Sequence, residues 1–183
     1  MRGVCWLIGG LWVVLTGYLS FAAIGVKRDT RGHLCQSFGL LLAIVASFWL
    51  PHLSIFRFLN FTPVHPVASG VGAILCLAGM SILAWARRCL GRNWSQTVSV
   101  KEGHELVTSG PYRVIRHPMY AGGLLACLGS AVACGGTWIV LLFVLGSLFL
   151  WRVAAEDRLM ARQFPHEYPA YRRRTKRLVP FVF

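Results

Sequence analysis

Residues 110–120 read GPYRVIRHPMY and lead into an apolar stretch that runs to residue 134. This segment contains two prolines, two arginines, a histidine and two tyrosines. A connector that only joins two membrane helices needs no such set of cationic and aromatic side chains. The segment therefore marks the place where the polar chemistry of the chain meets its hydrophobic part.

The surrounding sequence has the composition of a membrane protein. It has 183 residues, of which 56% are hydrophobic and 14% are charged, and its mean hydropathy is +0.58. Soluble domains contain roughly 45–50% apolar residues. All six acidic residues and nearly all of the 19 lysines and arginines lie outside the long apolar stretches. We therefore predict an all-α integral membrane protein in which residues 1–183 form a single membrane domain.

Five apolar stretches are the predicted spans, at residues 3–26, 34–52, 67–86, 119–134 and 137–155. The first is longer than the roughly 7–15 apolar residues of a cleavable signal peptide, so we expect a retained helix. The fourth is short, and only Gly135 and Gly136 separate it from the fifth, which predicts that these two spans form a helical hairpin. Beyond the fifth span we expect an amphipathic helix from Glu156 to about Arg174.

The distribution of basic residues predicts the orientation. The net charge is +13, but the basic residues flank apolar spans, which argues against nucleic acid as a partner and favours membrane lipids. The connectors after the first three spans carry three, one and six lysines and arginines, and the tail from Arg152 carries eight. Because cytoplasmic segments favour these residues, we predict an extracytoplasmic N-terminus and a cytoplasmic C-terminus.

The six cysteines show no C-x-x-C spacing and lie in or near apolar spans. We interpret them as small packing residues of membrane helices, and predict neither a disulfide framework nor a metal site. The sequence also has no H-x-x-E-H motif and no zinc-type spacing of cysteine and histidine.

The connector and the tail carry several short motifs in a fixed order. The connector contains LGRNWS (90–95), HELVTSGPY (104–112) and RHPMYAG (116–122). The tail contains EDRL (156–159), followed by Phe164, Tyr168, Tyr171 and Pro180. Together these pieces resemble the isoprenylcysteine carboxyl methyltransferase family and its bacterial relatives, a group similar to the membrane phospholipid methyltransferases. The resemblance extends from Leu90 to the end of the chain, and the first two spans match only as hydrophobic segments.

This resemblance implies an enzyme that uses S-adenosyl-L-methionine, with S-adenosyl-L-homocysteine as its product. It implies carboxyl methylation of an isoprenylcysteine-like, lipophilic acceptor that enters from the bilayer. The catalytic part would then be residues 87–183, where the cytoplasmic connector and the C-terminal helix form the cofactor pocket. The cofactor-binding residues implied are His104, Leu106, Val107, Gly110, Tyr112, Arg116, His117, Pro118 and Tyr120.

The residue chemistry of the motif agrees with such a cofactor. Pro118 suits the first turn of a helix, with His117 as its cap, and a helix N-terminus favours an anion. We therefore assign the carboxylate of the cofactor to Arg116, His117 and the start of the fourth span. The aromatic faces of Tyr112 and Tyr120 suit a sulfonium cation.

Glu156 corresponds to the functional acid of the family, and we predict that it is catalytic. A carboxylate acceptor is already ionised at neutral pH, so it needs a positioning cation and no general base. The tail offers Arg162, Arg172, Arg173 and Arg174, which spacing does not separate; Arg162 and Arg173 are taken as catalytic candidates. The chain departs from the family pattern at Asp157, where a second glutamate is common, and at Pro165, where glycine is usual.

Other interpretations remain open at this point. An amine acceptor, such as a phospholipid headgroup, would need a base to remove a proton before attack. A small membrane scaffold with a basic cytoplasmic face would bind no cofactor. The tyrosines of the motif could be interfacial aromatics, the tail arginines could face lipid, and Asp157 could be a solvated neighbour of Glu156.

Overall fold

The computed structural model describes residues 2–24, 65–93 and 106–180. In these ranges the regular elements are α1 (Arg2–Ile24), α3 (Pro66–Leu90), η3 (Gly91–Asn93), η4 (Gly110–Arg113), α4 (Pro118–Cys134), α5 (Thr137–Gln163) and α6 (Tyr168–Arg174). One isolated parallel bridge, between Ile115 and Lys176, is the one strand-like pairing within this part of the chain. The described structure is therefore helical, as predicted.

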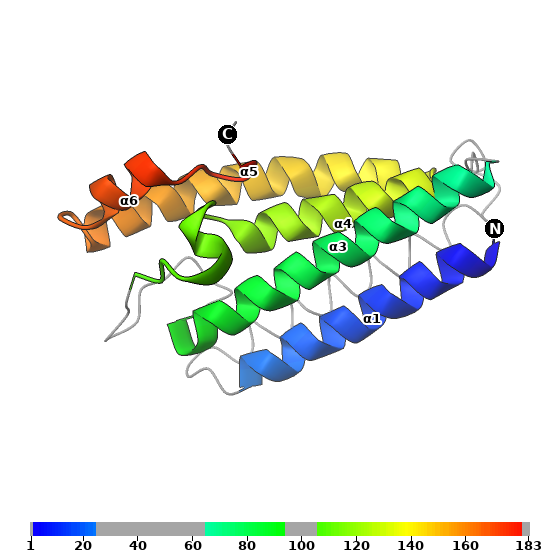
Figure 1. The fold of residues 1–183 in the computed structure, drawn as a ribbon, viewed down its shortest axis with the longest axis horizontal. Helices are drawn as coiled ribbons and strands as arrows, with labels where there is room; N and C mark the ends of the chain where they lie inside the picture. Colours follow the sequence, from blue (N-terminus) through cyan, green and yellow to red (C-terminus); the bar gives the residue numbers. More distant parts are fainter. Residues whose placement is uncertain (1, 25–64, 94–105, 181–183) are drawn as a thin grey trace.

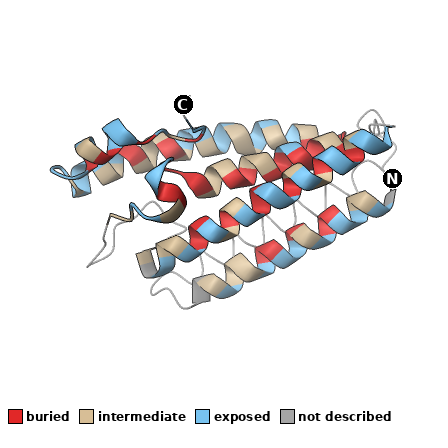
Figure 2. Ribbon diagram, viewed as in Figure 1, coloured by how far each residue is buried: buried red, intermediate tan, exposed pale blue. Residues whose placement is uncertain are grey.

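The long helices lie side by side in a bundle. Helix α4 lies between α3 and α5, and α1 packs against both α3 and α4 (Figure 1). Helix α6 lies at one end of the bundle and the N-terminus lies at the other end. The buried residues gather on the facing sides of α3 and α4, while α5 exposes much of its length (Figure 2).

Three of the described helices, α1, α3 and α5, are long and apolar enough to cross a membrane. Helix α4 is shorter, with 17 residues, and most of its residues are buried between its neighbours. Together with the exposed apolar side chains, such as Phe143 and Trp151, these helices identify an integral membrane protein. The second predicted span, residues 34–52, lies outside the described residues, so the count of five spans stays a prediction.

Helices α3 and α4 approach each other closely through glycines. Gly72 and Gly79 on α3 face Gly129 and Gly122 on α4, and each pair is seven residues apart, which places both members on one face of a helix. A Cβ atom at Gly72 would lie 2.5 Å from the backbone nitrogen of Ala133, and one at Gly122 would lie 2.7 Å from the carbonyl oxygen of Gly79. Small residues allow this contact, which favours helix association in a membrane through close packing.

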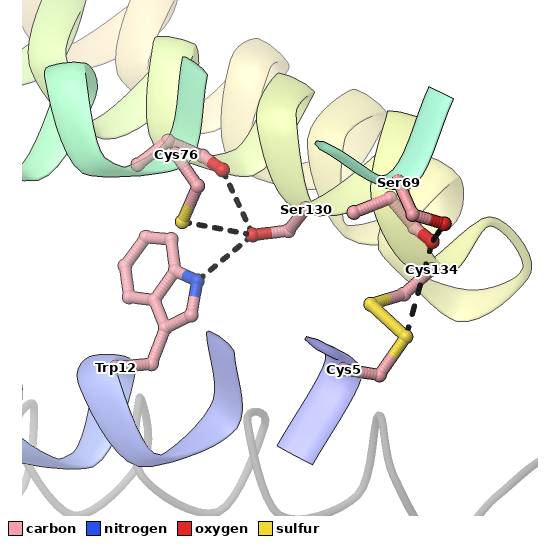
Figure 3. The surroundings of a disulfide bond; sticks show 8 residues. Cys5, Trp12, Ser69, Cys76, Ser130 and Cys134 are labelled. Atoms are coloured by element: carbon pink, nitrogen blue, oxygen red, sulfur yellow. Dashed lines mark hydrogen bonds between the residues drawn. A yellow bond between two sulfur atoms is a disulfide. The ribbon is translucent and has the colours of Figure 1, made fainter. Parts of the chain in front are cut away.

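Helix α1 is joined to this pair by a buried polar contact. Trp12 Nε1 donates to Ser130 Oγ at 3.0 Å, and Ser130 Oγ donates to the carbonyl of Ala126 at 2.8 Å (Figure 3). The sulfur of Cys76 lies 3.5 Å from the same hydroxyl. The indole of Trp12 also stacks on that of Trp138, with 5.7 Å between ring centroids. These contacts satisfy polar groups that are buried between apolar helices.

The interpretation of all the cysteines as simple packing residues was wrong for one pair. Cys5 and Cys134 form a disulfide that links the start of α1 to the last residue of α4 (Figure 3). They are 129 residues apart in sequence and meet because α1 packs along α4. Cys76 and Cys127 are free and buried between helices, as expected for packing residues.

The predicted helix from Glu156 to about Arg174 is not one helix. Instead α5 continues through Glu156 to Gln163, and α6 begins at Tyr168 after a break. Pro165 explains the break, because proline lacks a backbone N–H and disfavours a helical conformation in the residue before it. Pro169 in the first turn of α6 suits the new start.

Candidate active site

The two polar segments singled out in the sequence lie against each other at the end of the bundle that carries α6. Arg116 N donates to the carbonyl of Lys176 at 2.7 Å, and His117 N donates to that of Arg177 at 3.0 Å. Lys176 N donates back to the carbonyl of Val114 at 3.1 Å. The segment after α6 thus runs beside the residues that lead into α4, next to the C-terminal turns of α5.

Asp157 of α5 is the most highly connected side chain at this end of the bundle. It is only 6% exposed. Its carboxylate accepts hydrogen bonds from Arg177 Nε at 2.9 Å and from the hydroxyl of Tyr168, and lies 2.9 Å from His117 Nε2. The Nε atom of Arg116 lies 3.5 Å away. One buried carboxylate therefore holds together α5, the start of α4, α6 and the segment after it.

Glu156, the preceding residue, is half-buried and turns toward the apolar part of the bundle. Its Oε1 atom accepts a hydrogen bond from the hydroxyl of Tyr120 at 2.5 Å and lies 3.5 Å from Arg152 Nε. Its Oε2 atom lies 3.5 Å from His117 Nδ1. The imidazole of His117 is therefore held between two carboxylates, one on each ring nitrogen.

This position determines the charge of His117. Burial by itself would lower the pKa of the imidazole, but hydrogen bonds and charge from Asp157 and Glu156 outweigh it and raise the pKa above its ordinary value. When the ring is protonated, both of its nitrogens act as donors, one toward each carboxylate, since an imidazolium has no acceptor. His117 occupies the N-cap position of α4, but its side chain makes no capping hydrogen bond. Its ring nitrogens instead contact the carboxylates of Glu156 and Asp157 on α5, which differs from the predicted capping role.

Arg116 directs its guanidinium to the chain itself. Its Nη1 atom donates to the carbonyls of Thr175 and Arg172, and its Nε atom pairs with Asp157. The predicted contact of Arg116 with the carboxylate of a cofactor stays a prediction. In the structure this side chain instead fixes the segment that follows α6.

The two predicted tyrosines line different parts of the site. Tyr112 is buried in η4, and its carbonyl accepts a hydrogen bond from the hydroxyl of Tyr171 at 2.8 Å. Burial raises the pKa of Tyr112 well above its ordinary value, so its phenol stays neutral. Tyr120 lies on the first turn of α4, between the ring of Phe149, 4.9 Å away, and that of His117, 6.0 Å away.

The remaining residues that were predicted to bind the cofactor lie at the start of α4 or before it in the chain. Pro118 is buried as the first residue of α4, and Gly110 begins η4 with a φ of 59°, which favours glycine. Leu106 and Val107 are half-buried in a segment without regular structure. His104 lies outside the described residues.

Arg162 and Arg173, the predicted catalytic arginines, are exposed, and neither makes an ion pair with a residue in the described ranges. The arginine that pairs with Glu156 is Arg152, one turn before it on α5. Its Nε atom is buried and has no hydrogen-bond partner within the described residues. The signal for it was present in the sequence, since an arginine inside an apolar span has a functional role by default.

Asp157, Tyr168 and Arg177 were also missed as parts of the site. Asp157 and Tyr168 belong to the tail pattern and Arg177 does not, and nothing in the spacing of the three residues indicates that they meet. Within the described ranges, no group of three or more histidine, cysteine, aspartate or glutamate side chains could hold a metal ion.

Comparisons with known proteins identify the family of this chain. The sequence model of the phospholipid methyltransferase family matches residues 67–167, which is more than half of the chain. A probable protein-S-isoprenylcysteine O-methyltransferase of Oryza sativa subsp. indica is 25% identical over 99% of this chain and 98% of its own length. The protein-S-isoprenylcysteine O-methyltransferase of Saccharomyces cerevisiae is 29% identical over 80% of this chain and 62% of its own length.

The fold has a solved counterpart. The structure of the eukaryotic intramembrane Ras methyltransferase, isoprenylcysteine carboxyl methyltransferase, superimposes with a TM-score of 0.66. It is 19% identical in sequence, and the match covers 98% of this chain and 68% of that one. The resemblance seen in the connector and the tail is thus confirmed. The chain belongs to the phospholipid methyltransferase family and is a membrane methyltransferase whose curated relatives include the isoprenylcysteine O-methyltransferases.

Proposed function

We propose that this protein transfers a methyl group from S-adenosyl-L-methionine to the carboxylate of an isoprenylcysteine-like acceptor that reaches the site from the bilayer. The names of the relatives support the acceptor class. The observation that carries the proposal is the placement of His117, Glu156 and Arg152 in one cluster at the end of an apolar helix bundle. The cluster joins the RHPMY motif to the acidic pair of the tail.

The side chains of the cluster fit the charged groups of this cofactor. Glu156 is a half-buried carboxylate suited to an ammonium group, and the neighbouring ring of Tyr120 suits a sulfonium. When bound, S-adenosyl-L-methionine supplies a methyl carbon activated by the adjacent positive sulfur. Glu156 and Tyr120 would hold and orient that end of the molecule, and the backbone at Leu106 and Val107 would face the adenine.

Arg152 is the cation that best suits the acceptor carboxylate. It is the arginine of α5 that contacts Glu156, and its buried Nε atom has no hydrogen-bond partner among the described residues. Exposed apolar side chains of the same helix, including Leu148 and Trp151, offer a hydrocarbon path to it from the bilayer. We therefore assign to Arg152 the role that was predicted for Arg162 and Arg173, which are exposed and lie apart from Glu156 in the described ion pairs.

The reaction then needs alignment and no proton transfer. An acceptor carboxylate is ionised at neutral pH, so its oxygen would accept the methyl group without a base, and the sulfonium of the cofactor would leave as a neutral thioether. Arg152 and Glu156 fix the two reacting groups in line. Such positioning accounts for large rate factors, and a displacement of about 1 Å costs on the order of 100-fold.

The proposed site faces the cytoplasm. Six exposed basic residues lie at this end of the bundle between Arg158 and Lys176, as expected for a cytoplasmic surface. The Cys5–Cys134 disulfide lies at the end where α4 finishes, away from the site at the start of α4. Since disulfides persist in oxidising compartments, its position supports the same orientation.

The decisive experiment is a methylation assay with the protein in lipid nanodiscs. An S-farnesylated cysteine derivative and a methyl-labelled donor are supplied, and the product is treated with alkali. A methyl ester releases labelled methanol, so we expect alkali-labile label from the wild-type protein. Arg152→Gln and Glu156→Gln should each lower kcat/KM by about 100-fold. Absence of labelled ester from a folded protein would overturn the proposal.

A second acceptor class is an amine of a phospholipid headgroup, which the description of the matching family favours. An ammonium must lose a proton before it attacks, so the rate would fall steeply below neutral pH. The labelled product would be a lipid whose methyl group resists alkali. The same assay with phosphatidylethanolamine as the supplied acceptor therefore separates the two classes.

A further inference from the structure

The exposed basic side chains at the site end of the bundle form a surface that the proposed reaction does not use. We define this basic surface by Arg158, Arg162, Arg172, Arg173, Arg174 and Lys176, which are all exposed. None of them makes an ion pair with another described residue. Of the three acids in the described ranges, only Glu167 is exposed, because Glu156 and Asp157 are committed to the cluster. The surface is therefore strongly cationic.

Its arginines are held in place by the residues beneath them. Helix α6 turns Tyr168 and Tyr171 inward, where their hydroxyls donate to Asp157 and to the carbonyl of Tyr112. Thr175 continues this buried face, since residues three and four apart share a side of a helix. The three arginines that end α6 consequently point away from the protein. The charge is thus presented by an ordered element.

The height of this surface relative to the bilayer indicates its partner. The apolar part of α5 ends at about residue 155, so Arg158 lies about 4.5 Å and Arg162 about 10 Å beyond it along the helix axis. The headgroup layer of each leaflet is roughly 5–8 Å thick. Arg158 therefore lies within the headgroup layer, at the level of lipid phosphates, and Arg162 lies just beyond it.

We infer that this basic surface binds the headgroups of anionic phospholipids in the leaflet onto which the site opens. Arginine forms bidentate hydrogen bonds with phosphate, and several arginines on one short helix can engage neighbouring lipids together. An acidic protein would also match the charge, but the depth of Arg158 within the headgroup layer favours lipid. The inference requires only the membrane position of α5 and does not depend on the identity of the methyl acceptor.

The test measures binding of short-chain lipids to the detergent-solubilised protein by isothermal titration calorimetry. Dihexanoyl phosphatidylglycerol is compared with dihexanoyl phosphatidylcholine, inorganic phosphate and polyglutamate. The variant R158Q/R172Q/R174Q removes three charges and leaves the cluster intact. Each basic residue near an anionic surface contributes about fivefold in affinity, so the variant should lose on the order of 100-fold for phosphatidylglycerol. The matched variant R158K/R172K/R174K keeps the charge and should lose less than tenfold.

Each alternative outcome overturns the inference. Equal affinity for the two lipids, or an unchanged affinity in the glutamine variant, would remove the role of the basic surface. Inorganic phosphate bound as tightly as the lipid would indicate a free-anion site, and binding of polyglutamate without the lipid would indicate an acidic protein partner. A thermal unfolding midpoint close to that of the wild type verifies that the glutamine variant is folded.

Discussion

At the scale of single residues, the site depends on one buried carboxylate that has several partners. Asp157 meets a histidine, a tyrosine and two arginines, which come from the start of α4, from α6 and from the segment after α6. A buried carboxylate in such a position is needed because its removal would leave several cations without a counter-charge. Its role is to position His117, and through it Glu156.

Replacement of Asp157 by asparagine should therefore destabilise the protein. The buried charges of His117, Arg116 and Arg177 would lose their common anion, at a cost of roughly 3 kcal/mol. Thermal unfolding in detergent should show a clearly lower midpoint, together with reduced methyl transfer. Asp157→Glu retains the charge and restores the residue common in the family, so it should recover most of the stability. An asparagine variant as stable as the wild type would contradict this role.

The protonation of His117 should make stability depend on pH. The pKa of the imidazole is raised in the folded protein above the value of about 6.5 in the unfolded chain. The stabilisation is therefore fully present below pH 6.5 and is lost as the pH rises through the folded pKa. The other charged groups around the ring are Asp157, Glu156, Arg116 and Arg177. Burial raises the pKa of Tyr168 above its ordinary value, so its phenol stays neutral over this range.

The measurement is the thermal unfolding midpoint between pH 6 and pH 9. We expect the midpoint of the wild type to fall as the pH increases, and that of His117→Gln to start lower and to change less. A midpoint that rises with pH in the wild type, or identical profiles for both proteins, would show that His117 carries no extra proton in the folded state.

At the scale of elements, the contact between α3 and α4 leaves no room for a side chain at the glycines that form it. The glycines at 72, 79, 122 and 129 let the two backbones touch, and a side chain at any of them must displace the opposite helix. This close packing also fixes the position of the site, because α4 carries His117 and Tyr120 at its start. Packing in the apolar part of the bundle thus fixes the polar end.

Gly79→Ala should therefore be destabilising even though alanine favours a helix. Its Cβ atom would collide with the backbone of Ala126 and Gly122, and overpacking of this kind costs about 1–3 kcal/mol. Gly70, on the same helix, has no atom within 4 Å of the corresponding position and is the matched control. Gly70→Ala should be neutral or stabilising by up to about 1 kcal/mol. Equal thermal midpoints for the two variants would refute the close contact.

The sequence predicts the positions of the helices better than it predicts which side chains the helices bring into contact. The apolar lengths of α1, α3 and α4 were predicted because hydropathy reports burial in lipid directly. The continuation of α5 past Glu156 was missed, since charge was taken to end the helix, whereas Pro165 ends it. Arg152 was counted with the tail for the same reason, although its position one turn before Glu156 places it in the cluster.

At the scale of the whole molecule, long-range contacts account for what the sequence did not predict. The family resemblance identified the RHPMY motif and Glu156, which do lie together. The partners of Asp157 come from residues 116–177, and no local pattern encodes their convergence. The pairing of Cys5 with Cys134 is of the same kind, since spacing alone cannot select two of six cysteines.

The Cys5–Cys134 disulfide should stabilise the bundle without taking part in methyl transfer. It ties α1 to α4 across 129 residues of sequence, at the opposite end of α4 from His117. Disulfides of this kind contribute about 2–4 kcal/mol, so Cys5→Ser should lower the thermal midpoint and leave the rate per folded molecule within about twofold of the wild type. A reducing agent should lower the midpoint of the wild type and leave that of Cys5→Ser unchanged. Mass spectrometry of alkylated protein should find Cys5 and Cys134 unlabelled until reduction. Labelling of both thiols in non-reduced, denatured protein would show that the bond is absent, and with it the support that it gives to the orientation of the site.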